Sequence, residues 1–431
     1  MAGISAQKGS GLVLQERAGS GLVPTPAALA ERPAIRECLQ WFRRERQWIN
    51  EQHLALCRIP AATFREQERA AWMLDRFRDI GWPARLDRAG NVITGPGGGR
   101  EGPFVALTAH LDTVLAPRLA GDITVEGDGR FHGPGVSDNG AGLAALLAIA
   151  RAMRATLASE EFALPPLFIA NVGEEGEGNL SGMRYLCRPG GLGARARAFL
   201  VLDGPGSDHV TCRALASRRF EVSLNGPGGH SWSDYGIGNP VQAISRAVAL
   251  FCENRLAANG GPRSSFNFGT IEGGTSVNSI PVSAHAKVDI RSESIERVDE
   301  LSQLLAAAVE RAVEVENDRS SGGKVSARIR EIGMRPDGQL AEGAPLLACL
   351  RAVDAYLGIR TRLDCASTDA NIPLSLGMAA VSLGAGGQGG GAHTPSEWFD
   401  PEGREPGLQR ILLTMCLLMS ENDARGAPER R

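Results

Sequence analysis

Acidic and imidazole side chains follow several apolar segments of this chain, at the points where those segments end. Two adjacent glutamates, Glu174 and Glu175, follow the apolar run 167–170, and burying like charges is costly unless a cation or a reaction uses them. The other segments lead to residues that commonly bind metals: His110 and Asp112 after 104–109, Asp203 after 199–202, and His393 after 379–383 and a glycine loop. In open α/β sheets the carboxyl ends of the strands line one crevice, so we expect these side chains to meet there.

These residue types suit a pair of divalent metal ions. Such a pair needs a bridging carboxylate, mixed nitrogen and oxygen ligands for each ion, and an open position for water. Asp138 lies between glycine turns and a predicted helix start, where one carboxylate could touch two ions. Asp112 could accept the second ring N–H of His110 and so fix the ring. In the Glu174–Glu175 pair one acid can bind metal while its neighbour serves as a general base.

Each of these residues also has a purely structural interpretation. Asp138 could cap the following helix, and Asp203 could be a turn residue in Asp-Gly-Pro-Gly. The two glutamates could lie in a solvated acidic loop, Arg291 could form a surface ion pair, and His230 could be a turn residue after two glycines. The joint occurrence of these residues, more than any single one, favours a metal centre.

The elements that would position these residues alternate between strand and helix in the first part of the chain. Helices are expected in the 35–60 region and over 63–80, and the alanine-rich segment 143–155 is typical of a helix buried against a sheet. From about residue 214 the pattern changes to strand, helix, strand, strand, helix, strand, which predicts a ferredoxin-like insertion in an α/β fold. We expect a loose N-terminal arm over 1–30, a catalytic domain made of 31–213 and 334–425, and an inserted domain over 214–333.

Six short motifs carry a resemblance to a known family: His110-Leu-Asp112, Gly-Val-Ser-Asp138, Glu174-Glu175-Gly176, Leu202-Asp203-Gly204, Gly-Gly-His230-Ser231 and Ala392-His393-Thr394. In this order they resemble the co-catalytic zinc peptidase and deacylase family of aminoacylase, peptidase T, carboxypeptidase G and succinyl-diaminopimelate desuccinylase. The resemblance spans roughly residues 35–420. It implies a zinc-peptidase-like catalytic domain with a central, mostly parallel sheet, together with a ferredoxin-like lid or dimerisation domain.

The same resemblance implies roles for individual residues. One zinc would be bound by His110, Asp138 and Asp203, the other by Asp138, Glu175 and His393, and Glu174 would act as the base. In the inserted domain His230 would stabilise the oxyanion, often across a dimer, Asn278 would bind substrate beside it, and Arg291 would pair with a substrate carboxylate. Cobalt or manganese could replace zinc, and a homodimer through the inserted domain is expected. Apart from the resemblance, Gly386 and Gly387 in the glycine loop could let a substrate approach the backbone closely.

Two departures from the family pattern concern the activity. Gly140 stands where many relatives carry a lysine after the bridging acid, so any contribution of that lysine is missing. Asp203 resembles the aminopeptidase members, whereas glutamate is common in the carboxypeptidase and desuccinylase members. We therefore expect a dinuclear zinc hydrolase that cleaves an amide bond of small peptides, aminopeptidase-like. The main alternative is deacylation of N-acyl amino acids. Two lesser alternatives are a non-catalytic protein that binds peptides or carboxylates and a dinuclear phosphoesterase.

The bulk composition limits the partners and the compartment. The 431 residues carry a net charge of -3 with both signs interspersed, so nothing favours nucleic acid or an anionic membrane surface as a partner. No run reaches the roughly 18 consecutive apolar residues of a membrane-spanning helix, and no export signal is visible. The eight cysteines are scattered without a CxxC pair, as in proteins of reducing compartments. We expect a cytoplasmic protein.

Overall fold

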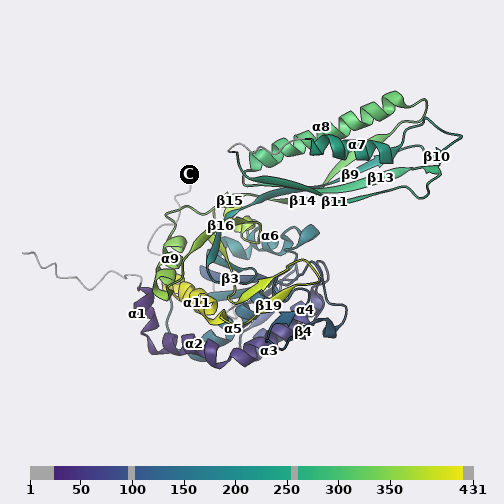
Figure 1. Ribbon diagram of the computed structural model, residues 1–431. Helices are drawn as coiled ribbons and strands as arrows, with labels where there is room; N and C mark the ends of the chain where they lie inside the picture. Colours follow the sequence, from purple (N-terminus) through teal and green to yellow (C-terminus); the bar gives the residue numbers. More distant parts are fainter. Residues whose placement is uncertain (1–23, 96–101, 254–260, 421–431) are drawn as a thin grey trace, which may run out of the picture.

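The computed structural model describes residues 24–95, 102–253 and 261–420. The chain forms a larger α/β body from which a smaller unit of sheet and helices projects (Figure 1). This smaller unit, residues 216–335, is called the inserted domain below. The helices of the larger body are α1 (Pro26–Ala30), α2 (Pro33–Arg44), α3 (Arg46–Cys57), α4 (Gln67–Asp79), α5 (Gly140–Thr156), α6 (Ser181–Cys187), α9 (Pro345–Leu357), α10 (Asn371–Ser375) and α11 (Arg404–Ser420), with short 3-10 helices η1 (Ala120–Asp122), η2 (Gly176–Gly178) and η3 (Leu192–Arg195).

A nine-stranded, mostly parallel sheet forms the centre of the larger body, as predicted. Its strands are β1 (Ala84–Leu86), β2 (Val92–Thr94), β6 (Pro166–Asn171), β3 (Phe104–His110), β7 (Ala196–Leu202), β17 (Ala380–Leu383), β8 (His209–Ala214) and β15 (Gly338–Gln339), in that order, with β16 (Arg362–Ala366) also paired to β8. A second, small sheet contains β18 (Gln388–Gly390), β19 (Trp398–Asp400), β5 (Phe131–His132) and β4 (Thr124–Val125).

Apolar residues on both faces of the central strands explain why this sheet is buried between helices. Alternate residues of a strand point to opposite faces. In β3, Val105 and Leu107 belong to one core cluster with residues of helices α2, α3, α5 and α11, whereas Ala106 belongs to another with residues of α6 and α10. The near-continuous apolar runs in the sequence are therefore those of a parallel sheet covered on both faces.

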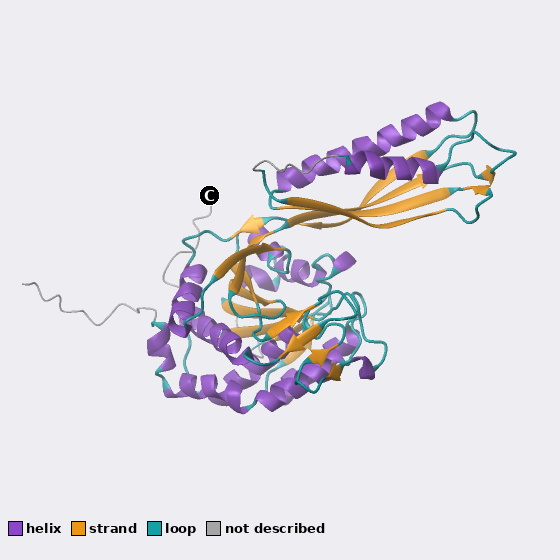
Figure 2. Cartoon of the chain, viewed as in Figure 1, coloured by secondary structure: helices purple, strands orange, loops and turns teal. Residues whose placement is uncertain are grey.

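The inserted domain has the predicted order of elements. It contains β9 (Ala216–Asn225), β10 (Gly229–His230), α7 (Pro240–Cys252), β11 (Ser264–Gly273), β12 (Ser279–Ile280), β13 (Ser283–Ser292), α8 (Ile295–Arg319) and β14 (Ser326–Arg335). The four long strands pair in the order β11-β13-β9-β14, and α7 and α8 lie together on one side of them (Figure 2). Phe220, Val222 and Leu224 of β9 contribute to the core under these helices, which accounts for the alternation of apolar and polar residues in that strand.

Some boundaries differ from those predicted. The helical region 35–60 is two helices, α2 and α3, which meet at Glu45, and the helix expected over 63–80 begins at Gln67. Residues 26–30, expected in a loose arm, form α1 because Pro26 suits a first helical turn and Leu29 is buried in the core. The predicted arm before residue 24, and residues 421–425 of the predicted catalytic domain, lie outside the described residues. Within the part that is described, no helix has both the length and the hydropathy needed to cross a membrane.

Candidate metal and active site

The parallel register of the central strands brings their carboxyl ends to one level. His110, the last residue of β3, pairs with Asn171 at the end of β6, and Ala109 pairs with Leu202 at the end of β7. Asp203 follows directly after Leu202. The predicted meeting of side chains at one edge of the sheet is therefore present for these segments.

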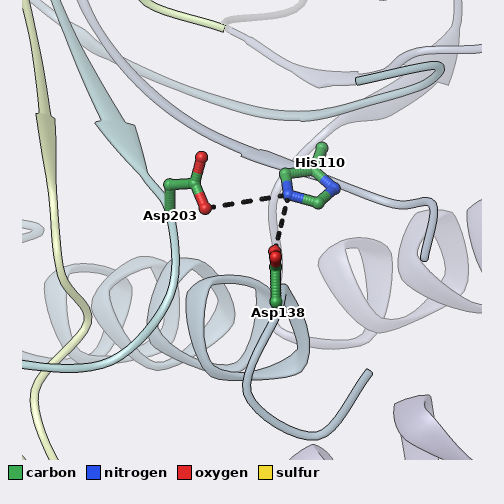
Figure 3. A group of neighbouring side chains, drawn as sticks. All are labelled: His110, Asp138 and Asp203. Atoms are coloured by element: carbon green, nitrogen blue, oxygen red, sulfur yellow. Dashed lines mark ion pairs between the residues drawn. The ribbon is translucent and has the colours of Figure 1, made fainter. Parts of the chain in front are cut away.

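His110 faces two carboxylates. Its Nε2 lies 3.2 Å from Oδ1 of Asp138 and 3.9 Å from Oδ1 of Asp203 (Figure 3). Its Nδ1 lies 3.0 Å from the backbone oxygen of Asp112 and 3.6 Å from the carboxylate of that residue. The hydrogen bond we predicted to the Asp112 carboxylate is thus made by the backbone carbonyl, which can only accept. In the neutral ring Nδ1 then carries the hydrogen, and Nε2 is left with a lone pair directed at the two acids.

The Asp112 carboxylate instead holds the backbone of the two glutamates. Its oxygens accept the N–H of Glu174 at 3.0 Å and the N–H of Glu175 at 2.9 Å, and the hydroxyl of Thr63 also donates to it at 3.0 Å. Glu175 then extends toward His393, with 3.1 Å between its Oε1 and the imidazole Nε2. Asp112 therefore connects His110 with both members of the acidic pair.

Asp138 lies between the two histidines. Besides its contact with His110, its Oδ2 lies 3.1 Å from Nε2 of His393. The helix cap that Asp138 might have formed is made by Asn139, whose Oδ1 accepts the N–H of Gly142 at 3.1 Å, so both oxygens of Asp138 can bind a cation. His393 itself has φ of +65°, a backbone conformation that non-glycine residues adopt rarely and that often occurs at functional sites.

Glu397 holds the loop that carries Asp138, and no pattern in the sequence indicated this role. Its buried carboxylate accepts backbone N–H groups of Gly135 at 2.7 Å, Ser137 at 2.8 Å and Asp138 at 2.8 Å. Three donors around one carboxylate fix the course of a loop that contains two glycines with positive φ, Gly133 and Gly135. Such support orients a metal ligand without touching the metal.

Three groups of side chains could hold metal ions. The ligand atoms within each group all lie within 4.8 Å of one another: His110, Asp138 and Asp203; Asp138, Glu175 and His393; and His110, Glu174 and Glu175. The first two groups are the ligand sets implied by the sequence, and they share Asp138. Nε2 of His110 and Oδ1 of Asp138 are buried and have no hydrogen-bond partner in the part of the chain that the structure describes, which is costly unless a cation lies between them. Imidazole nitrogens with carboxylate oxygens are donors that zinc prefers, so the residues fit a dinuclear centre.

The crowding of charge shifts the pKa values of these side chains. Burial and the charge of Glu174 raise the pKa of Glu175 to about 7, and burial together with the charge of Asp138 raises the pKa of Asp203 well above 3.8. Hydrogen bonds to Asp138 and Glu175 raise the pKa of His393 to about 10. The pKa of His110 is also raised, because its acidic neighbours outweigh the effect of burial. The raised pKa values favour protonation of these groups, and bound cations would compensate the same negative charge.

A cavity of about 390 Å³ opens beside this cluster. Its lining includes Asp138, Glu174, Glu175, Asp203 and His393, and also three arginines, Arg219, Arg291 and Arg335. Arg219 and Arg291 come from β9 and β13 of the inserted domain and share the carboxylate of Asp289, at 3.3 Å and 2.6 Å. Arg335, the last residue of β14, forms a buried ion pair with Glu174 at 2.8 Å. Neither Arg219 nor Arg335 was among the predicted site residues.

Asp369 is a further buried acid that the sequence analysis missed. It is fully buried and accepts a hydrogen bond from the side chain of Asn171, whose backbone lies beside His110 in the sheet. Burial, and then the charge of Glu174, raise the pKa of Asp369 to about 7. No apolar strand precedes this residue directly, so the pattern that revealed the other acids does not apply to it.

Six of the predicted residues do not line this cavity. His110 and Asp112 are buried beside the acids that do line it, whereas the other four lie elsewhere. His230 and Asn278 lie next to one another, since the N–H of Ser231 donates to the backbone oxygen of Asn278 at 3.0 Å, but they belong to the exposed end of the inserted domain around β10 (Figure 1). Gly386 and Gly387 have positive φ, and a Cβ on them would lie 2.4 Å from the oxygen of Arg404 and 2.6 Å from that of Asp400. Close packing against the backbone of the same chain therefore accounts for these glycines.

Comparison with known proteins gives one family and a shared fold. Residues 106–416 match Peptidase family M20/M25/M40. The uncharacterized protein YqjE of Bacillus subtilis (strain 168) is 24% identical over 351 residues, which cover 78% of this chain and 89% of that protein. A tripeptidase from Staphylococcus aureus subsp. aureus Mu50 has a TM-score of 0.68 at 18% identity, covering 87% of this chain and 99% of its own. The di-peptidase Dug1p from Saccharomyces cerevisiae also has a TM-score of 0.68, at 14% identity, and the match covers 90% of this chain and 99% of that one.

Proposed function

The chain belongs to Peptidase family M20/M25/M40 and is a hydrolase of peptide or amide bonds, and we propose that it is a dinuclear zinc enzyme that cleaves small peptides. The observation that carries the proposal is the pair of three-residue groups that share Asp138 at the carboxyl ends of the parallel strands. His110, Asp138 and Asp203 would hold one zinc, and Asp138, Glu175 and His393 the other. Cobalt or manganese can occupy such a site. When bound, ions of this kind polarise a carbonyl group and make water a better nucleophile at neutral pH.

Glu174 is the general base in this proposal. Its Oε1 is engaged by Arg335, so Oε2 remains to take a proton from the attacking water and to pass it to the leaving amine. Glu174 is buried, and its carboxylate lies within 4.8 Å of ligand atoms of His110 and Glu175. Burial excludes bulk water from this proton transfer.

The charges of the cavity favour a peptide with free ends. Arg291 and Arg219 share one carboxylate, Asp289, which leaves a surplus positive charge for the carboxylate of a substrate. Asp364, on β16 of the larger body, also lines the cavity, and among the described residues no cationic side chain pairs with it. A free substrate amine can bind there, whereas an N-acyl amino acid has no such group. This feature favours peptide cleavage of the aminopeptidase type over deacylation.

The exposed end of the inserted domain would act in a homodimer. His230 and Asn278 adjoin one another but do not line the cavity of their own chain. As oxyanion-binding and substrate-binding residues they would serve the active site of a second copy. The eight cysteines are free, which supports a reducing, cytoplasmic location.

A substrate panel on one metal-loaded preparation tests the proposed function. Tripeptides, dipeptides and N-acetyl amino acids are assayed with zinc, cobalt or manganese, and we expect turnover of free peptides. Glu174→Gln should lower kcat by about 10²–10⁴-fold with the metal content unchanged, while Glu126→Gln, which alters an exposed carboxylate near His132, should leave kcat unchanged. Cleavage of acetylated substrates alone would assign the chain to deacylases, and full activity after exhaustive chelation would refute the metal mechanism.

A further inference from the structure

Arg335 grips the residue that the proposed function assigns as the base. Its Nη1 lies 2.8 Å from Oε1 of Glu174, and its Nη2 donates to the backbone oxygen of the same residue. Nη1 also donates to the hydroxyl of Ser367 at 3.0 Å. One planar guanidinium therefore fixes both the side chain and the main chain of Glu174, a two-point hold for which the fork of arginine is suited and the single ammonium of lysine is not.

The ion pair between Arg335 and Glu174 is buried, so its loss should change the orientation of Glu174. The side chains of Arg335 and Glu174 are each 5% exposed. Removing one partner of a buried pair leaves the other charge without compensation, so the remaining carboxylate must turn toward another donor or toward solvent. A rotation of Glu174 would move the oxygen that accepts the proton, and small displacements of a reacting group have large effects on rate.

The inserted domain also contacts the residues that follow Glu174. Arg219 of β9 donates to the backbone oxygen of Gly176, and Lys287 of β13 pairs with Glu177 at 2.6 Å. On β14 the N–H of Met334 donates to Oδ1 of Asn179 at 3.1 Å. Three strands of the inserted domain thus hold the 174–179 loop, and Arg335 ends the strand that returns to the central sheet.

We infer that Arg335 is a positioning residue that orients Glu174 and makes its orientation depend on how the inserted domain sits on the 174–179 loop. The inference rests on the proposed function, because it needs Glu174 to be the base. Arg335 belongs to neither proposed set of metal ligands, and it links the inserted domain physically to the proposed base. Because Arg335 and Met334 of β14 hydrogen-bond to Glu174 and Asn179, a displacement of β14 should also move Glu174.

The test is a comparison of Arg335→Ala and Arg335→Lys with the wild-type chain. For both variants we expect kcat to fall about 10–100-fold, with KM changed less than about 2-fold and metal content retained. Guanidinium ion added to Arg335→Ala should restore part of kcat. Arg330→Ala is the matched control, because Arg330 lies on the same strand, is exposed and pairs with Glu221 at 2.6 Å. Its kcat should be unchanged.

A second measurement does not use activity. In thermal unfolding of the metal-free chain, Arg335→Ala should lower Tm less in the Glu174→Gln background than in the wild-type background, because the charge that Arg335 compensates is then gone. An unchanged kcat in Arg335→Ala, a rise in KM in place of a fall in kcat, or equal Tm losses in the two backgrounds would each overturn the inference. A wild-type chain that hydrolyses no amide with any of the metals would instead overturn the proposed function, and the inference with it.

Discussion

The substitution Asp112→Asn isolates what one carboxylate contributes to the site. Asp112 is fully buried, and its oxygens accept N–H groups from Glu174 at 3.0 Å and Glu175 at 2.9 Å and a hydroxyl hydrogen from Thr63 at 3.0 Å. Asparagine keeps the shape of the side chain but removes its charge and replaces one oxygen with an NH₂ donor. That donor must then face at least one backbone N–H.

The size of the effect follows from these contacts. A hydrogen bond to a charged group contributes about 1.5–3 kcal/mol, and a buried N–H left without an acceptor costs about 1–3 kcal/mol. Because the loop can relax in part, we expect a loss of about 3 kcal/mol in unfolding free energy, which lowers Tm by about 3 °C in a chain of this size. The displaced loop carries a ligand and the proposed base, so metal affinity should fall about 10–100-fold and kcat about 100-fold.

Denaturant unfolding of the metal-free chain, metal competition with a chromophoric chelator, and steady-state kinetics measure these three quantities. Asp122→Asn is the matched control, since Asp122 also accepts two backbone N–H groups, at 2.7 Å and 3.1 Å, but is exposed and belongs to the 3-10 helix η1. It should leave metal affinity and kcat unchanged. If Asp112→Asn keeps the metal affinity and kcat of the wild type, Asp112 does not hold the acidic pair in a working position.

Three further expectations concern the same site. Burial alone would raise the pKa of Asp112, but the charge of His110 and the backbone N–H groups of Glu174 and Glu175 outweigh it and hold that pKa below its ordinary 3.8. The contribution of Asp112 to stability is therefore present above pH 3.8 and is lost as pH falls through the lower folded value. The stability difference between wild type and Asp112→Asn should shrink correspondingly in acid denaturation curves. The pKa of His393 is about 10 and that of His110 is raised, so metal binding at pH 8 should release protons. Calorimetry of metal binding in two buffers of different ionisation enthalpy should then give different heats. Equal heats would contradict proton release on binding. Arg291→Ala should raise KM about 10–100-fold for a peptide with a free carboxylate and little for its C-terminal amide, and equal changes for both substrates would argue against carboxylate binding.

The arrangement of the central sheet could be predicted because parallel strands leave a direct mark in the sequence. Strands buried on both faces are continuous apolar runs, and their carboxyl ends lie together, so His110 and Asp203 could be assigned to one edge of the sheet before any contact was known. The ferredoxin-like order followed from the alternation of apolar and polar residues in β9 and β13. The break between α2 and α3 was missed because residues on both sides of Glu45 continue the helical pattern.

The residues that support the site could not be predicted in the same way. Glu397 and Arg335 act through contacts with segments more than a hundred residues away, and neither ends an apolar run or belongs to one of the short motifs. The contacts of Glu397 and Arg335 depend on the paths that loops take at the edge of the sheet, and the local residue pattern does not encode those paths. The glycines of the 384–391 loop show why composition alone is ambiguous. Gly386 and Gly387 would suit close approach of a substrate, but close approach of the chain to itself also explains them.

The two parts of the structure contribute opposite charges to one cavity. The larger body supplies Asp138, Glu175 and Asp203, and burial together with the charges of neighbouring acids raises the pKa values of Glu175 and Asp203. The inserted domain supplies Arg219 and Arg291. A substrate carboxylate that approaches the arginines also approaches these acids, and its binding is opposed while the acids carry negative charge. Divalent cations on the proposed ligands would make the charge of this part of the cavity more positive. We therefore expect a peptide with a free carboxylate to bind more tightly to the metal-loaded protein than to the metal-free protein, and equal affinities would contradict this reasoning.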